Sequence, residues 1–251
     1  MTDIGTPDRI AVLAHWSDSA VVNRSFRTLV REFSVNGYLP IIVSAAEFDE
    51  PLDWSGGLPG NAVVLRKPNL GYDFGSWAIA IDRIPAISCA RYVVLANDSV
   101  IGPFASLQPL LRAFEGSAAD VWGLTDTRQY FLHLQSYFLG FRNGVLAEPV
   151  LRAFWAGVRD EPVKWNVINN NELGLSRLLY REGFAATAAF RGDDIVAYGE
   201  NPVIRGWWIL LENGFPFVKR EIVRNPSVAP NGEAVAREVK AVYGVELDDW
   251  I

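Results

Sequence analysis

A strand–helix–strand succession at the start of the chain constrains the fold more than any other feature of the sequence. Two apolar runs, residues 10–14 and 39–43, have the length of short buried strands. Between them, residues 21–36 place apolar side chains at spacings of four, three, one and three, which lines up one face of a helix. Gly37 stands where a glycine commonly ends a helix. Two buried strands joined by a helix predict parallel strands with a right-handed crossover.

The same alternation continues along the chain. Further strands are expected at residues 62–65, 92–96, 121–124 and 137–141, and further helices at residues 74–84, 107–114, 149–158, 172–182, 203–213 and 234–243. Strands that alternate with helices are typical of a Rossmann-like α/β fold, with a mainly parallel sheet and helices on both faces. A chain of 251 residues is within reach of one large α/β domain, so we expect residues 1–251 to form a single domain.

Composition excludes several classes of protein. The chain is 50% hydrophobic and 21% charged, which excludes a disordered chain. Its 29 acidic residues against 23 basic ones argue against a general affinity for nucleic acid. Cys89 is the one cysteine, so the sequence has no disulfide framework and no cysteine-rich zinc site. With no apolar run near 18 residues and no signal-peptide pattern, we expect a soluble, cytoplasmic protein, peripheral at most to the inner face of the membrane.

Polar residues follow the ends of the expected strands. They are His15 to Ser19, Ser44, the segment from Lys67 to Asp73, and Asn97, Asp98 and Ser99. Ligands of open α/β sheets bind beyond the carboxyl ends of the strands, so this pattern predicts a site for a nucleotide-type ligand. In the segment RKPNLGYDFGSW, Lys67 and backbone amides are suited to a diphosphate, although neither G-x-G-x-x-G nor the P-loop pattern is present. The alternative is an ordinary loop, with Gly71 at positive φ and Asp73 capping the next helix.

Two further carboxylates are candidates for chemistry. Asp98 follows a buried strand and is suited to hold a divalent cation or a sugar hydroxyl, or else to start an Asx turn. Glu172 opens a helix, where a carboxylate can act as a general base. Its spacing of three from Asn169 is equally that of a capping box.

The remaining polar and aromatic candidates have structural alternatives too. His15 and His133 are isolated histidines, and a hydrolase nucleophile elbow G-x-S-x-G is absent from the sequence. Lys219 and Arg220 are suited to close over a leaving diphosphate, or to form a salt-bridged strand end. The nine tryptophans suit core packing or stacking on sugar rings, and we expect core packing for most. If an acceptor is lipid-linked, Phe215, Phe217 or Trp207–Trp208 are the candidate docking residues.

Several motifs together resemble the rhamnan synthesis protein F family of bacterial polysaccharide glycosyltransferases. They are KPNLGYDFGSW, VLANDSVIGPF, HLQSYFLGF, NELGLSRLLYREGF, NPVIRGWWILLENGFPFVKRE and VYGVELDDWI. Their order is also similar to that of the wider inverting A-type glycosyltransferases. The resemblance implies a Rossmann-like nucleotide-sugar fold, a nucleoside-diphosphate donor, typically dTDP-L-rhamnose, and a growing glycan or lipid-linked glycan as acceptor.

The resemblance also implies roles for individual residues. The nucleotide would be lined by His15, Ser19, Ser44, Lys67, Asn69, Gly71 and Asp73. The segment Asn97-Asp98-Ser99 would replace the family's Asp-x-Asp metal motif, with Asp98 as the single carboxylate for Mg or Mn. Lys67, Lys219 or Arg220 are the alternative sources of positive charge. Glu172 would be the catalytic base, and His133, Gln135 and Ser136 would lie near the acceptor.

Alternatives to this function remain open at the level of the sequence. One is transfer from a different nucleotide-sugar. Another is a non-catalytic glycan-binding domain of a polysaccharide assembly complex. A Rossmann oxidoreductase is disfavoured because HWSDS, and no glycine-rich turn, follows the first strand. The glycosyltransferase hypothesis predicts that Lys67, Asp98 and Glu172 meet in one shared cleft.

Overall fold

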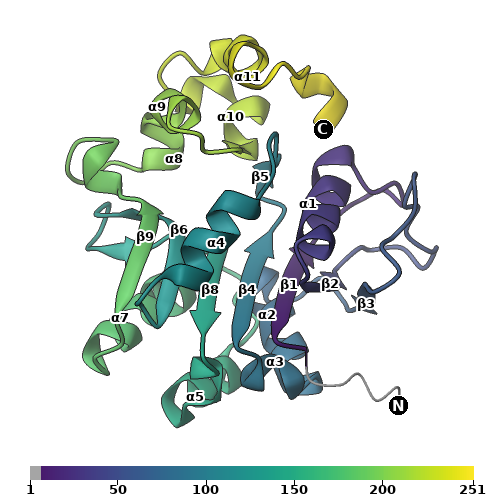
Figure 1. The fold of residues 1–251 in the computed structure, drawn as a ribbon, viewed down its shortest axis with the longest axis vertical. Coiled ribbons are helices and arrows are strands. Elements are labelled where there is room, and N and C mark those ends of the chain that lie inside the picture. The colour runs from purple at the N-terminus through teal and green to yellow at the C-terminus, as the bar shows by residue number, and fades with distance from the viewer. Residues whose placement is uncertain (1–6) are drawn as a thin grey trace.

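The computed structural model describes residues 7–251 as a mostly parallel central sheet flanked by helices (Figure 1). The strands are β1 (Arg9–His15), β2 (Leu39–Ser44), β3 (Val63–Arg66), β4 (Tyr92–Asn97), β5 (Val100–Ile101), β6 (Val121–Thr127), β7 (His133–Leu134), β8 (Phe138–Arg142), β9 (Ala186–Phe190) and β10 (Val218–Lys219). The α/β class expected from the sequence is confirmed.

Helices fill most of the connections between the strands. They are α1 (Arg24–Val35), α2 (Tyr72–Arg83), α3 (Ala86–Cys89), α4 (Gln108–Gly116), α5 (Pro149–Gly157), α6 (Lys164–Val167), α7 (Leu173–Arg181), α8 (Pro202–Arg205), α9 (Trp207–Glu212), α10 (Arg220–Arg224) and α11 (Val235–Tyr243). A π-helical segment, Ile168–Glu172, joins α6 to α7. Short 3₁₀ turns cover Val145–Ala147, Gly192–Asp194, Pro226–Val228, Gly232–Ala234 and Leu247–Trp250.

The sheet runs in the order β3-β2-β1-β4-β8-β6-β7, and β9 pairs with β6. Strands β1 to β4 are mutually parallel, with Ile10 opposite Leu39 of β2 and Val93 of β4. Strand β8 is antiparallel to both of its neighbours, β4 and β6. The parallel order predicted from the first half of the chain is therefore interrupted in the middle of the sheet.

Two apolar layers cover the faces of the sheet. On one face, α1 and α4 pack against alternate residues of β1 and β4. On the other, α2, α5 and α7 contribute Trp77, Trp155 and Leu179 to the second layer. Helix α1 forms where the sequence predicts it, because Asn23 accepts a hydrogen bond from the Phe26 N–H at 2.9 Å and Gly37 follows at φ +82°.

The C-terminal helices form a third apolar cluster at one end of the sheet. Figure 1 shows α8 to α11 gathered beside β5, and the short antiparallel pairing of β5 with β10 joins them to the sheet. Trp207, Trp250 and Val239 are buried in this cluster. Within residues 7–251, every helix is too short or too polar to cross a bilayer.

The structure differs from the sequence-based expectations at three places. Residues 203–213 form two helices, α8 and α9, because Gly206 packs against Val196 so closely that a Cβ would come within 2.8 Å of it. Strand β9 was not predicted, because its sequence ATAAF is rich in alanine and carries little strand preference. The segment HLQSYFLGF forms two strands, β7 and β8, separated by a turn.

Candidate functional site

The carboxyl ends of β1 and β4 bring the first polar residues together. Asp98, which follows β4, accepts a hydrogen bond through Oδ2 from the Trp16 N–H after β1, at 3.0 Å. Arg220, at the start of α10, donates from Nε to the Asp98 carbonyl at 2.9 Å. Burial raises the pKa of Asp98, and the Trp16 N–H and Arg220 oppose that rise. Segments more than 120 positions apart in the sequence thus meet at one residue, Asp98.

Asp73 lies beside Asp98 in the first turn of α2. Its Oδ2 accepts a hydrogen bond from Asn97 Nδ2 at 2.6 Å. Burial and the neighbouring Asp98 carboxylate raise the pKa of Asp73 to about 7, while Lys219 and the Asn97 hydrogen bond oppose the rise. Asp73 is not a helix cap, because Gly71 occupies the N-cap position and its φ is +74°. The expected positive φ at Gly71 is confirmed.

Lys219 supplies a cation to these carboxylates. Its Nζ donates to Ser99 Oγ at 3.0 Å and lies 5.3 Å from the centre of the Tyr137 ring. Burial lowers the pKa of Lys219, whereas Glu172 and Asp73 raise it. The β5–β10 pairing sets this geometry by placing Lys219 opposite Val100, next to Ser99. We call Asp73, Asp98, Lys219 and Arg220 the charged cluster.

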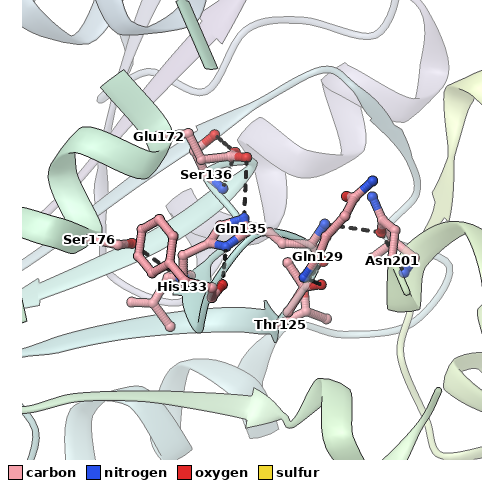
Figure 2. Close-up of polar contacts among 12 residues, drawn as sticks. Thr125, Gln129, His133, Gln135, Ser136, Glu172, Ser176 and Asn201 are labelled. Atoms are coloured by element: carbon pink, nitrogen blue, oxygen red, sulfur yellow. Dashed lines mark hydrogen bonds and ion pairs between the residues drawn. The ribbon is translucent and has the colours of Figure 1, made fainter. Parts of the chain in front are cut away.

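Glu172 lies at the end of the π-helical segment between α6 and α7. The capping-box alternative is wrong, because residues 164–181 form one uninterrupted helical run and Glu172 has helical φ and ψ of −64° and −56°. Figure 2 shows its carboxylate turned toward Ser136. Glu172 Oε2 accepts hydrogen bonds from the Ser136 N–H, at 2.9 Å, and from the Ser136 hydroxyl. π-helical turns of this kind are frequent at functional sites.

The second carboxylate oxygen of Glu172 is left for another partner. Oε1 lies 3.8 Å from His133 Nε2, which is too far for a hydrogen bond, and no residue that the structure describes donates to it. His133 Nδ1 lies 2.7 Å from the Phe131 carbonyl, so Nδ1 carries the proton that is donated there. We call Glu172, Ser136 and His133 the Glu172 site.

Gln135 has a supporting role in this region. Its side chain is buried, accepts a hydrogen bond from the Thr125 hydroxyl at 2.7 Å and donates to Asn201 Oδ1 at 3.1 Å (Figure 2). Asn201 also caps α8 by accepting from the Val203 N–H. Gln135 thereby fixes the turn that carries His133 and Ser136, because its own polar atoms are occupied.

Electrostatic influence links the two groups of residues. Glu172 affects the pKa of both Asp73 and Lys219, so the Glu172 site lies next to the charged cluster. Lys67 is also close enough to Asp73 for that carboxylate to raise its pKa against the lowering caused by burial. Asp73 is therefore electrostatically coupled to Lys67, Asp98 and Glu172.

His15 and Ser44 lie at the ends of neighbouring strands, with His15 Nδ1 and Ser44 Oγ 3.3 Å apart. Burial, together with the positive charges of Arg220 and Arg66, lowers the pKa of His15 to about 4, so the imidazole is neutral near pH 7. Both side chains are buried, at 2% and 0% exposed. They border the charged cluster through Arg220.

The loop after β3 makes close contacts within itself and also lines a cavity. Lys67 Nζ donates to the Leu70 carbonyl at 2.6 Å, and Gly71 and Gly75 approach so closely that a Cβ on Gly75 would come within 2.9 Å of the Leu70 carbonyl oxygen. Lys67 and Gly71 also line a cavity of about 1050 Å³ between α2 and α5. Asp98, Lys219 and Glu172 do not line that cavity, so this cavity is not the predicted shared cleft, and the convergence of Lys67, Asp98 and Glu172 stays a prediction.

Other predicted residues lie apart from the charged cluster or inside the core. Asn69 is exposed and donates to Glu47 at 2.9 Å, and Ser19 is exposed in a local turn. Phe215, Phe217 and Trp207 are 1–3% exposed, so the expectation that these three dock a lipid-linked acceptor is wrong, whereas Trp208 is half-buried and its part in that expectation stays a prediction. Their apolar surface is used in packing the C-terminal helices against the sheet.

The carboxylates of the charged cluster fit a divalent cation that arrives with a phosphate ligand. Among the described residues, no group of three or more His, Cys, Asp or Glu side chains could hold a metal ion by itself. Mg²⁺, however, is usually bound through one or two carboxylates plus substrate phosphates. Asp73 and Asp98 are suited to that requirement, because the Asp98 carboxylate raises the pKa of Asp73 and a cation would relieve the repulsion.

Sequence reasoning did not single out Tyr137 or the Trp16 backbone. The Tyr137 ring lies under Lys219, and its hydroxyl is 2.7 Å from the Thr125 hydroxyl. Both contacts join residues distant in the chain, and neither has a local sequence signal. The Asx turn expected at Asp98 is formed by Asn97 instead, whose Oδ1 accepts from the Ser99 N–H at 3.1 Å.

Comparison with known proteins shows which family this chain matches. The family model described as Rhamnan synthesis protein F matches residues 61–247. Virulence protein VirA of Vibrio anguillarum is 27% identical over 215 residues, covering 72% of this chain and 68% of that protein.

Two solved structures show more distant likenesses. A putative glucose-1-phosphate thymidylyltransferase from Bacillus anthracis, in complex with a sucrose, is 9% identical with a TM-score of 0.44, over 72% of this chain and 86% of that chain. The apo-form glycosyltransferase GlyE of Streptococcus pneumoniae TIGR4 is 9% identical with a TM-score of 0.36, over 71% of this chain and 45% of that chain.

Proposed function

The chain belongs to the rhamnan synthesis protein F family, and from that premise we propose that it is an inverting glycosyltransferase of bacterial cell-surface polysaccharide synthesis. The donor in this proposal is dTDP-L-rhamnose, and the acceptor is a hydroxyl of a growing glycan. The observation that carries the proposal is the position of Glu172, which holds one oxygen free beside a cluster that pairs two carboxylates with two cations.

The proposed reaction is a single displacement. Glu172 Oε1 takes the proton of the acceptor hydroxyl, whose oxygen forms the new bond to the anomeric carbon. The bond from that carbon to the diphosphate oxygen breaks, and its electron pair leaves with the diphosphate. A positioned general base is worth about 10²–10⁴-fold in rate. Ser136 supports this role because it holds Oε2 and so orients Oε1.

The charged cluster would stabilise the departing diphosphate. Lys219 and Arg220 supply positive charge, and one well-placed donor of this kind contributes about 2.7–4 kcal/mol in comparable oxyanion sites. His15, Ser44 and the loop from Lys67 to Asp73 would line the nucleotide. A divalent cation held by Asp98 and Asp73 would supply further charge compensation when it is bound.

The proposal is tested by the substitution Glu172→Gln, which keeps the shape of the side chain and removes the base. We expect the rate of sugar transfer to fall about 10²–10⁴-fold. Binding of dTDP, measured by thermal shift, should stay unchanged. The matched control is Glu212→Gln, because Glu212 is an exposed glutamate at the end of α9.

Two outcomes would contradict the proposal. If Glu172→Gln transfers sugar at the wild-type rate, Glu172 is not the base. If neither dTDP, UDP nor GDP stabilises the wild-type protein, the chain is a glycan-binding module and not a transferase. Stabilisation by UDP or GDP but not by dTDP would support a transferase that uses a nucleotide-sugar other than dTDP-L-rhamnose.

A further inference from the structure

Two exposed aromatic side chains meet beside the Glu172 site. Tyr130, in the turn before β7, is 50% exposed, and Trp165, in α6, is 47% exposed. Their ring centres lie 5.1 Å apart at an interplanar angle of 65°. Single exposed aromatic side chains are common on protein surfaces. Two exposed rings from separate segments that pack against each other form a defined aromatic surface.

This aromatic pair is connected to Glu172 through His133. The Tyr130 and His133 rings lie 6.3 Å apart and nearly parallel, at 28°, and His133 Nε2 faces Glu172 Oε1 at 3.8 Å. Trp165 lies on the same helical run as Glu172, seven residues before it. At a rise of 1.5 Å per residue, about 10 Å separates the two residues along the helix axis. The pair is therefore linked to Glu172 Oε1 through the His133 ring.

A transferase binds two substrates, and the position of the aromatic pair suits the acceptor sugar better than the nucleoside-diphosphate donor. The fixed charges suited to a nucleoside diphosphate lie in the charged cluster, on β1, β4, α2 and β10. The exposed ring surface lies on α6 and the turn before β7, on other elements than those that carry the charged cluster. A neutral sugar offers C–H groups to an aromatic face and needs little charge, so it suits this side better than a diphosphate does.

Building on the proposed function, we propose that Tyr130 and Trp165 form the platform on which a pyranose ring of the acceptor glycan stacks, with its hydroxyl directed at Glu172 Oε1. The platform is a positioning and specificity element of the acceptor site. His133, which is 2% exposed, forms its inner wall.

The test compares Trp165→Ala and Tyr130→Ala with the wild type in two reactions of the same donor. With a rhamnose disaccharide as acceptor, we expect each variant to raise the acceptor KM about tenfold, the size of one stacking contact. With water as acceptor, donor hydrolysis should be unchanged. Trp165→Phe should recover most of the loss because it keeps a ring. Tyr180→Ala, an exposed aromatic on α7, is the matched control.

A second measurement keeps the platform testable if the protein transfers nothing. Tryptophan fluorescence is titrated with the same disaccharide, and binding that disappears in both Ala variants supports the platform even where the transferase proposal fails. An unchanged acceptor KM, or unchanged disaccharide binding, in both variants would overturn it. A parallel fall in donor hydrolysis would also overturn it, because the residues would then support the fold or the donor site.

Discussion

The charged cluster and the Glu172 site both contain carboxylates, but the surroundings of those carboxylates differ. In the charged cluster, Asp73 and Asp98 are partly buried and their pKa values are raised, and Lys219 and Arg220 offset the cost of that burial. In the Glu172 site, the carboxylate is 24% exposed and one of its oxygens is fixed by Ser136. The first arrangement is suited to bind charge, and the second to accept a proton from a substrate that reaches it from solvent.

The largest effect that separates the two regions should come from Lys219. Replacing it with methionine keeps the aliphatic stem against Tyr137 and removes the cation. We expect kcat to fall about 10²–10³-fold, because one donor to the developing diphosphate charge is lost. Unlike Glu172→Gln, this change should also weaken dTDP binding in a thermal-shift titration.

The control for Lys219→Met is Lys240→Met, on exposed α11, where the lysine pairs only with Glu246 in the part of the chain that the structure describes. Wild-type dTDP affinity in Lys219→Met would break the comparison, because the charged cluster would then have no part in holding the diphosphate.

A smaller effect should come from Asp98. We expect Mg²⁺ to increase the stabilisation by dTDP in the wild type, and Asp98→Asn to remove that increase while retaining the response seen with chelator. A tenfold loss of affinity is about 1.4 kcal/mol at saturating ligand, or a shift of roughly 4 °C for a domain of this size. Asparagine keeps an oxygen for the Trp16 N–H, so the fold should tolerate it.

Asp82→Asn, at the exposed end of α2, is the matched control for Asp98→Asn. Equal dTDP stabilisation with Mg²⁺ and with chelator in the wild type would assign the charge compensation to Lys219 and Arg220 alone.

The sequence predicted the first half of the sheet because the signals there are local. Residues 10–14 and 39–43 form parallel strands as expected, since each apolar run and the amphipathic α1 between them lie within 35 positions. The antiparallel direction of β8 was not predictable in the same way, because it depends on its insertion between β4 and β6. A strand buried on both faces has the same apolar pattern in either direction.

In the candidate site, too, features with local sequence signals were predicted and contacts between distant segments were not. The rule that ligands bind at the carboxyl ends of strands brought Asp73, Asp98 and Asn97 into one group, and the structure has them in contact or electrostatically coupled. The cation–ring contact of Lys219 with Tyr137 and the pairing of Tyr130 with Trp165 join segments that no periodicity relates. The interpretation of Asn169 and Glu172 as a capping box failed because the helix continues through both residues from α6.

The last prediction concerns the stability of the protein and how the charged cluster makes it depend on pH. The pKa of Asp73 is raised to about 7 in the folded state, from an ordinary value near 3.8. Between these values the folded state binds more protons at Asp73 than the unfolded state does. Its contribution to the free energy of unfolding therefore decreases as pH rises from about 4 to about 7.

Asp73→Asn removes that pH-dependent cost. We expect the Tm of this variant, relative to the wild type, to increase between pH 5 and pH 8, as measured by thermal melting at both values. His15, whose pKa is lowered to about 4, contributes in the opposite sense between pH 4 and about 6.5, but it is present in both proteins and cancels in the difference. A Tm difference that stays constant or decreases toward pH 8 would mean that Asp73 is charged at little cost. The charged cluster would then not place Asp73 under the burial and repulsion described for it.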